Sequence, residues 1–215
     1  MKYNHFIFDM DGTLADTSPG VFEGVRLTLR QMGEPLLPES ELRRFIGPPL
    51  HHSFQEICGM DEERAMEATL RFRSYYKDEG VFRSRLYDGM ETLLRTLRAE
   101  GHKLMVATLK REEQAQSLVK YLGIADCFSA VVGSDDGEQR TKKDTIEIAM
   151  ELSGIGSPKD VLMIGDSEFD AVGAAQAGVD FCAATYGFGL TPEVLKQHSY
   201  KLEIASPLEL LEKIK

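Results

Sequence analysis

Two aspartates lie two positions apart in the segment Phe8-Asp9-Met10-Asp11-Gly12-Thr13, close to residue 1. A carboxylate can attack phosphorus to form a covalent intermediate, which splits one difficult step into two easier ones. Side chains two residues apart on an extended chain point to the same side, so the second carboxyl can protonate the leaving group and later deprotonate water. The pair predicts a nucleophile, Asp9, and a general acid and base, Asp11.

Three polar residues further along the chain complete this chemistry. The hydroxyl of Thr108 and the ammonium of Lys142 can bind the equatorial oxygens of a phosphoryl group in the transition state of its transfer. Asp166, together with Asp9 and a main-chain carbonyl near Asp11, offers the oxygen ligands that Mg²⁺ prefers. Since clustered carboxylates would repel an anionic substrate, the cation is also needed to offset their charge. The sequence therefore predicts magnesium-dependent phosphoryl transfer.

Residues around these candidates have supporting roles. Gly12 should let the chain turn sharply and, with Thr13, offer backbone N–H groups to the phosphoryl oxygens. Asp170 lies one helical turn beyond Asp166, and we expect it to hold Lys142 in place or to reach the metal through water. Each residue alone has an ordinary structural explanation as a turn, cap or solvated residue. Their joint order along the chain favours the chemical interpretation.

Short apolar runs alternate with helical patterns along most of the chain. Such runs are typical of buried parallel strands joined by helical crossovers. Strands are expected at 5–8, 103–108, 128–133, 161–166 and 180–185, and helices at 90–99, 112–122, 145–152 and 169–177. The fold class is α/β, a Rossmann-like doubly wound parallel sheet. Because parallel strands end at one edge, it would gather Asp9, Asp11, Thr108 and Asp166 in one crevice.

Residues 16–85 interrupt this alternation with helical patterns only. Ser18 and Pro19 suit the N-cap and first turn of a helix whose apolar stripe stops at Gly33, and a second long helix is expected over 61–77. The turn Gly47-Pro48-Pro49 cannot be helical; it either connects helices or presses on a ligand, with Gly47 a candidate substrate contact. We expect a catalytic core of 1–15 and 86–215 and an inserted helical cap of 16–85.

Composition limits the partners. The net charge of -10 argues against binding nucleic acid polymers or anionic membranes, so a phosphorylated substrate must be held locally. Apolar runs stay well short of the about 18 residues of a membrane span, and the first one is too short for a signal peptide. Three widely spaced cysteines in apolar neighbourhoods, Cys58, Cys127 and Cys182, are typical of buried reduced thiols. These features favour a cytoplasmic protein that acts on a small molecule, and they leave open whether it is a monomer or homodimer.

These motifs resemble those of haloacid dehalogenase-superfamily phosphatases with a helical cap, of the phosphoglycolate phosphatase or 5'-nucleotidase-like group. Residues 9–13 are similar to the first family motif, Thr108 to the second, Lys142 to the third, and Gly165-Asp166 with Asp170 to the fourth. The match spans almost the whole chain. The resemblance implies a phosphoaspartate intermediate, Mg²⁺, a cap that opens and closes, and a small phosphate monoester as substrate.

The chain departs from the family pattern at two places. Many relatives follow the third-motif lysine with Pro-x-Pro, whereas residues 141–146 here are similar to the Lys-x-acid-x-Ile form, which favours Lys142 over Lys143. In the second motif Leu109 separates Thr108 from Lys110, which leaves the role of Lys110 open. The segment 45–50 resembles the substrate-facing loop of the same group. His51 and His52 follow this loop, and a surface role is expected for them.

Alternative functions use parts of the same residue set. A phosphomutase also needs both carboxylates, but such relatives carry a histidine in the first cap segment, and 18–33 contains none. A dehalogenase needs no acid at the position of Asp11. A receiver-type signalling module combines Asp, Thr and Lys around Mg²⁺, yet it is shorter and has no helical insert. Hydrolysis of a phosphate monoester remains the first expectation, with the phosphomutase next.

Overall fold

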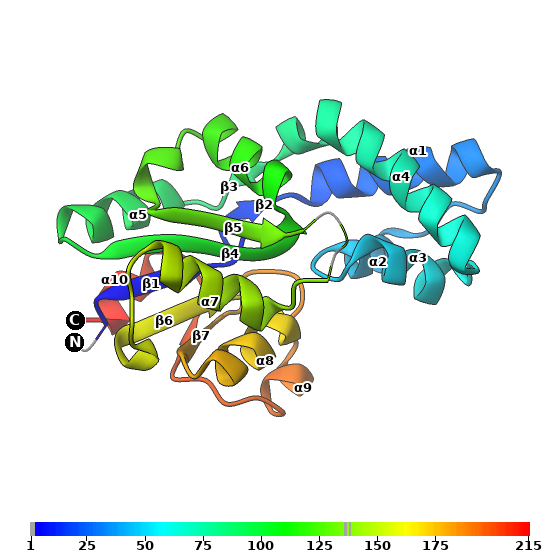
Figure 1. The fold of residues 1–215 in the computed structure, drawn as a ribbon. Helices are drawn as coiled ribbons and strands as arrows, with labels where there is room; N and C mark the ends of the chain where they lie inside the picture. The colour runs from blue at the N-terminus through cyan, green and yellow to red at the C-terminus, as the bar shows by residue number, and fades with distance from the viewer. Residues whose placement is uncertain (1–2, 136, 138) are drawn as a thin grey trace.

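The computed structural model describes residues 3–135, 137 and 139–215, which form a central parallel sheet with helices on both faces (Figure 1). The strand order is β5-β4-β1-β6-β7-β8, and every neighbouring pair is parallel. The strands are β1 (His5–Phe8), β4 (Lys103–Arg111), β5 (Ala130–Ser134), β6 (Val161–Gly165), β7 (Asp180–Ala184) and β8 (Leu202–Ile204). The α/β, Rossmann-like expectation is confirmed.

Burial on both faces explains why β1 is a continuous apolar run. Phe6 and Phe8 point into a core cluster that includes side chains of α5 (Met90–Ala99), α6 (Glu112–Tyr121) and α10 (Glu209–Lys213). Ile7 points into a second cluster with α7 (Lys142–Leu152) and α8 (Glu168–Ala177). Successive side chains on a strand face opposite sides, so both faces need cover. Short elements complete this part: α9 (Pro192–Leu195), η3 (Ala125–Cys127) and η4 (Pro158–Asp160).

The helical insert leaves and rejoins the sheet region through two short strands. β2 (Ala15–Asp16) pairs antiparallel with β3 (Arg85–Leu86), so the two connections run side by side. Between them lie α1 (Ser18–Met32), α2 (Glu39–Leu42), η1 (Arg43–Phe45), α3 (Leu50–Cys58), α4 (Glu62–Asp78) and η2 (Gly80–Arg83). Figure 1 shows the insert beyond the carboxyl ends of the strands. Whether it acts as a separate, moving cap stays a prediction.

The start of α1 corrects one expectation about capping. Ser18 was expected at the N-cap, but Thr17 occupies that position and makes no side-chain capping bond. The carboxylate of Asp16 instead accepts hydrogen bonds from the amide and hydroxyl of Ser18, at 3.1 and 2.6 Å. Asp16 thereby satisfies the amide of Ser18, one of the first N–H groups of the helix that have no partner within it. The expected end of α1 at Gly33 is confirmed, with φ 69°.

Two further expectations concern loops and thiols. Residues 47–49 are non-helical, as expected, and Gly47 has φ 104°. Cys58, Cys127 and Cys182 are free thiols, although Cys58 is only half-buried. None of the helices in the described part of the chain has both the length and the apolarity that crossing a bilayer requires.

Candidate active site

The carboxyl ends of β1, β4 and β6 bring the predicted polar residues together. Asp9 directly follows β1 and Asp166 directly follows β6, and both side chains are buried. Thr108 is buried too, but it lies inside β4, which continues to Arg111 with an irregular register after Ala107. The predicted crevice at the strand ends therefore contains an acidic group from each of two neighbouring strands.

Lys142 is the buried cation of this crevice. Its Nζ lies 2.5 Å from Asp9 Oδ1 and 2.5 Å from Asp170 Oδ1. The lysine is the first residue of α7, whose start is fixed by a capping box between Thr141 and Asp144. The structure therefore places Lys142 on the predicted nucleophile.

Lys143 points elsewhere. Its Nζ pairs with Glu147 one turn along α7, at 3.5 Å, and its side chain is exposed. Adjacent residues on a helix face different directions, which is why only one of the two lysines contacts Asp9.

Asp170 links Lys142 to the start of α8. Its Oδ2 accepts hydrogen bonds from the amide and hydroxyl of Ser167, at 3.0 and 2.7 Å, while Oδ1 faces Lys142. Two glycines make this approach possible. A Cβ atom on Gly165 would lie 2.4 Å from Asp170 Cβ, and one on Gly173 would lie 2.6 Å from Lys142 Cγ. Gly173 escaped the sequence analysis, since no local pattern shows which glycine faces another segment.

Asp166 is held from two sides. The hydroxyl of Thr13 donates to its Oδ1 at 3.0 Å, and the amide of Phe188 donates to its Oδ2 at 2.8 Å. Phe188 lies in the loop after β7, and the sequence does not predict its contribution because almost every residue type has a backbone N–H.

The expectation that Gly12 offers its amide to a phosphoryl oxygen has no support in the structure. That amide donates to the carbonyl of Ala15 at 2.9 Å within the turn after β1. Gly12 instead provides space, since its Cβ would meet Asp166.

Three carboxylates form a group that could hold a cation. Asp9, Asp166 and Asp170 each offer an oxygen, and these oxygens lie within 4.8 Å of one another. Burial raises the pKa of Asp9 to about 7, with Lys142 opposing the shift and Asp170 adding to it. Burial also raises the pKa of Asp166 well above its usual range. A buried all-oxygen donor set with excess negative charge fits Mg²⁺, which would favour the ionised carboxylates.

Asp11 lies outside this group of carboxylates. Lys110 Nζ contacts both of its carboxylate oxygens, at 2.9 and 3.1 Å. The side chain of Asp11 is 11% exposed and that of Lys110 is 7% exposed. The structure thus places Lys110, whose role the sequence left open, on the predicted general acid.

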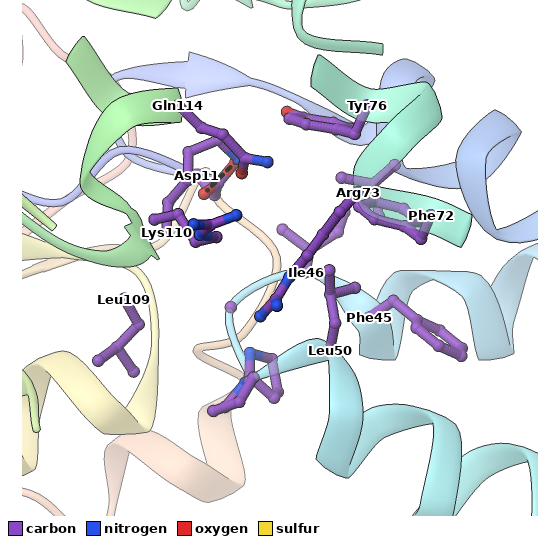
Figure 2. Close-up of a pocket in the computed structure, with 15 residues that line it drawn as sticks. Asp11, Phe45, Ile46, Leu50, Phe72, Arg73, Tyr76, Leu109, Lys110 and Gln114 are labelled. Carbon is purple, nitrogen blue, oxygen red and sulfur yellow. Dashed lines mark hydrogen bonds and ion pairs between the residues drawn. The ribbon is translucent and has the colours of Figure 1, made fainter. Parts of the chain in front are cut away.

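A pocket of about 60 Å³ opens beside Asp11, between the sheet and the helical insert (Figure 2). Lys110 and Gln114 line it from one side, and Arg73 and Tyr76 of α4 face them from the other. The insert also contributes an apolar wall and the Gly-Pro-Pro turn, namely Phe45, Ile46, Gly47, Pro48, Pro49, Leu50 and Phe72. Gly47 therefore lines the same pocket as Asp11.

The two histidines contact acidic neighbours on the insert. His51 Nε2 lies 3.4 Å from Glu62 and His52 Nε2 lies 3.2 Å from Glu56. His52 is largely exposed and lines a separate groove with Phe188. The expected surface role fits His52, and His51 is half-buried.

The doubly wound sheet and the buried acidic group at its carboxyl edge define an α/β protein with a site suited to a hard cation. Residues 6–184 match the family model of the haloacid dehalogenase-like hydrolases. The chain belongs to this family of hydrolases.

Individual relatives resemble it over most of its length. The chain is 35% identical over 218 residues to a 5'-nucleotidase of Pseudomonas aeruginosa, covering 99% of this chain and 97% of that protein. It is 31% identical over 189 residues to a phosphoglycolate phosphatase of Neisseria gonorrhoeae, covering 85% and 80%. The crystal structure of a predicted phosphatase from Clostridium acetobutylicum superposes with a TM-score of 0.92 at 39% identity, covering 100% and 99%.

Proposed function

We propose that this protein is a magnesium-dependent phosphatase that hydrolyses small phosphate monoesters through an aspartyl-phosphate on Asp9. The observation that carries the proposal is the contact of Asp9 with Lys142 inside a group of three buried carboxylates. The names of the relatives, a 5'-nucleotidase and a phosphoglycolate phosphatase, support the substrate class. The site combines a nucleophile, a cation and a second carboxyl beside a pocket.

The reaction has two steps. In the first, Asp9 attacks phosphorus, the bond between phosphorus and the ester oxygen breaks, and Asp11 gives its proton to the departing alcohol. In the second, water gives a proton to Asp11 and attacks phosphorus, which releases inorganic phosphate and restores the Asp9 carboxylate. Together the two steps return the enzyme to its starting state, and they consume only the ester and one water molecule.

The surrounding residues bind and orient. Lys142 holds Asp9 through its 2.5 Å contact and would lie beside the transferred phosphoryl group. Thr108 Oγ1 accepts a hydrogen bond from the amide of Lys110 at 3.2 Å, so its own proton can be donated to a phosphoryl oxygen. Mg²⁺, held by Asp9, Asp166 and a main-chain carbonyl near Asp11, with Asp170 close by, would supply positive charge that stabilises the transition state.

The pocket beside Asp11 bears on the size of the leaving group. The proton donor must reach the leaving oxygen, so the rest of the alcohol extends from Asp11 into this pocket. Its volume is about 60 Å³, and a groove of about 400 Å³ that includes Lys142 shares Pro49 and Leu109 with it. Both a short alcohol such as glycolate and a larger one such as a nucleoside are therefore candidates, which the panel of monoesters compares.

The experiment is a panel of monoesters with inorganic phosphate as readout. Phosphoglycolate, nucleoside monophosphates and sugar phosphates are compared by kcat/KM, with and without Mg²⁺. We expect phosphate release that EDTA abolishes and Mg²⁺ restores, and the acid-quenched enzyme to carry one phosphoryl group on Asp9. The Asp9→Asn variant should neither release phosphate nor carry a phosphoryl group. Isomerisation of a sugar phosphate without phosphate release would show a phosphomutase instead, and a stable phosphoenzyme without turnover would show a signalling module.

A further inference from the structure

Lys110 is a buried cation that the proposed reaction does not use. Its Nζ faces both oxygens of Asp11, whereas Asp9 and Asp170 are paired with Lys142. A surface ion pair of this kind would contribute little, but this one is almost fully enclosed. A buried lysine on a proton donor calls for an explanation of its own.

Proton transfer is sensitive to the position of the donor. A general acid must lie within hydrogen-bond reach of the oxygen that it protonates, and an aspartate side chain can rotate about two bonds. The backbone of Asp11 is fixed by the turn after β1, where the amides of Leu14 and Ala15 donate to the carbonyl of Met10. Contact of one ammonium with both carboxylate oxygens fixes the remaining two torsions.

Lys110 is in turn held by the helical insert. Its Nζ lies 4.5 Å from the centre of the Tyr76 ring, which comes from α4 and is buried. The ring is itself stacked on Phe72 of the same helix, with centroids 5.3 Å apart. An ammonium over an aromatic face is attracted by the ring's negative centre. Figure 2 shows the Asp11–Lys110 pair facing Tyr76 from the opposite side of the pocket.

We propose that Lys110 is a positioning residue for Asp11 and that the Tyr76 ring, carried by the helical insert, holds Lys110 in place. The proposal rests on the function proposed above, since it assigns Asp11 a proton-transfer role. It implies that Asp11 is correctly placed only when α4 packs against Lys110. The insert then contributes to the proton donor's geometry, and not only to the shape of the pocket.

Two substrates separate positioning from other roles. p-Nitrophenyl phosphate has a leaving group that needs little protonation, whereas an alkyl ester such as glycerol phosphate needs a proton in the first step. We compare Lys110→Met, Lys110→Arg and the control Lys120→Met, an exposed lysine on α6. With enzyme in excess over substrate, the rate of alcohol release in a single turnover measures the first step, and the dependence of this rate on enzyme concentration measures binding.

We expect Lys110→Met to slow the first turnover of the alkyl ester by about 10²-fold, with a much smaller effect on p-nitrophenyl phosphate and on binding of either substrate. Lys110→Arg should restore most of this rate, and Lys120→Met should match the wild type. An equal loss on both substrates, or weaker binding of both, would overturn the proposal, because it would show a structural or phosphate-binding role. A wild type that hydrolyses no monoester would instead refute the proposed function.

A second pair of variants keeps the inference testable if Lys110→Met does not fold. Tyr76→Phe retains the ring, so we expect it to keep a larger share of the alkyl-ester rate than Tyr76→Leu does. Tyr76→Leu removes the ring and should slow the alkyl ester by about threefold to thirtyfold, again with little effect on p-nitrophenyl phosphate. Thermal melting of each variant confirms that it is folded. Equal rates for Tyr76→Phe and Tyr76→Leu would overturn the role of the insert.

Discussion

Gly12 and Asp166 are so close that a Cβ atom on Gly12 would lie 2.2 Å from Asp166 Oδ2. The glycine also has φ 82°, a conformation that residues with a side chain rarely adopt. Although Gly12 and Asp166 are 154 residues apart in the sequence, the space between them cannot hold a methyl group on Gly12. The turn after β1 and the acidic residue after β6 can be assembled only with glycine at this position.

The first prediction follows from this contact. Gly12→Ala should displace Asp166 and weaken magnesium activation by at least tenfold, in addition to a backbone strain of about 1 kcal/mol. Gly59→Ala is the matched control, because Gly59 also has positive φ, at 66°, but open space around it. Mg²⁺ titrations of activity and urea unfolding measure both effects. If the two variants activate alike, the close packing at Gly12 is unimportant for the metal.

The second prediction compares adjacent lysines. Lys142→Met leaves Asp9 and Asp170 buried without their cation, so we expect loss of turnover and a decrease of about 3 kcal/mol in the free energy of unfolding. Lys143→Met removes only an exposed pair with Glu147 and should change stability by less than about 0.5 kcal/mol. Phosphate release and urea unfolding of both variants check the ranking. A larger effect at Lys143 would contradict the assignment of the third motif.

Elements that have a characteristic pattern of residue types could be predicted from the sequence. The strand before Asp9 is a run of buried apolar residues that ends at a carboxylate, and the strand before Asp166 has the same form. Both patterns arise because parallel strands are covered on two faces. The order of these elements predicted a parallel sheet with the site at the carboxyl ends of its strands. By contrast, β8 was missed, since three residues with a single buried side chain, Ile204, carry little pattern.

Contacts set by tertiary packing were not accessible. The pairing of Lys110 with Asp11 joins positions 99 residues apart and depends on how far β4 extends, which its apolar pattern does not define. The amide of Phe188 reaches Asp166 through a backbone group that every residue except proline has. At the start of α1 the sequence predicts Ser18 as the N-cap, and only the local geometry shows that Asp16 accepts hydrogen bonds from Ser18.

The third prediction concerns a link between Tyr3, which precedes β1, and Asp180, the first residue of β7. The hydroxyl of Tyr3 donates to Asp180 Oδ2 at 2.8 Å, and burial raises the pKa of Tyr3 from 10.0 to about 12. The folded protein therefore keeps this phenol neutral after the unfolded chain has ionised it. Its stabilising contribution is fully present below pH 10 and decreases as the pH rises to about 12.

Tyr3→Phe should lower the free energy of unfolding by about 1 kcal/mol at neutral pH. The difference from the wild type should shrink between pH 10 and 12, since groups that ionise in both proteins cancel in the comparison. Tyr200→Phe, at an exposed position, serves as the control and should match the wild type throughout. Urea unfolding across this range is the measurement. A constant difference between wild type and Tyr3→Phe would exclude the raised pKa.

The fourth prediction concerns how the stability of the protein depends on pH through Asp9, the proposed nucleophile. Burial raises the pKa of Asp9 from 3.8 to about 7, so the metal-free folded protein holds a proton there that the unfolded chain loses earlier. The contribution of Asp9 to stability is fully present below pH 3.8 and is lost as the pH rises to about 7. Asp9→Asn removes the ionisable group, so in EDTA this variant should become more stable than the wild type as the pH rises through that range.

In the presence of Mg²⁺ the wild type should instead be more stable than Asp9→Asn. A cation that binds only the folded state stabilises it by mass action, and it requires the ionised carboxylate, so the gain should be larger for the wild type than for Asp9→Asn. The gain should also decrease as the pH falls below about 7, because protons compete with the metal for Asp9. Melting temperatures with EDTA or Mg²⁺ at about pH 5.5 and about pH 8 measure the effect without relying on turnover. Equal magnesium stabilisation of both proteins at both pH values would show that Asp9 is not a ligand.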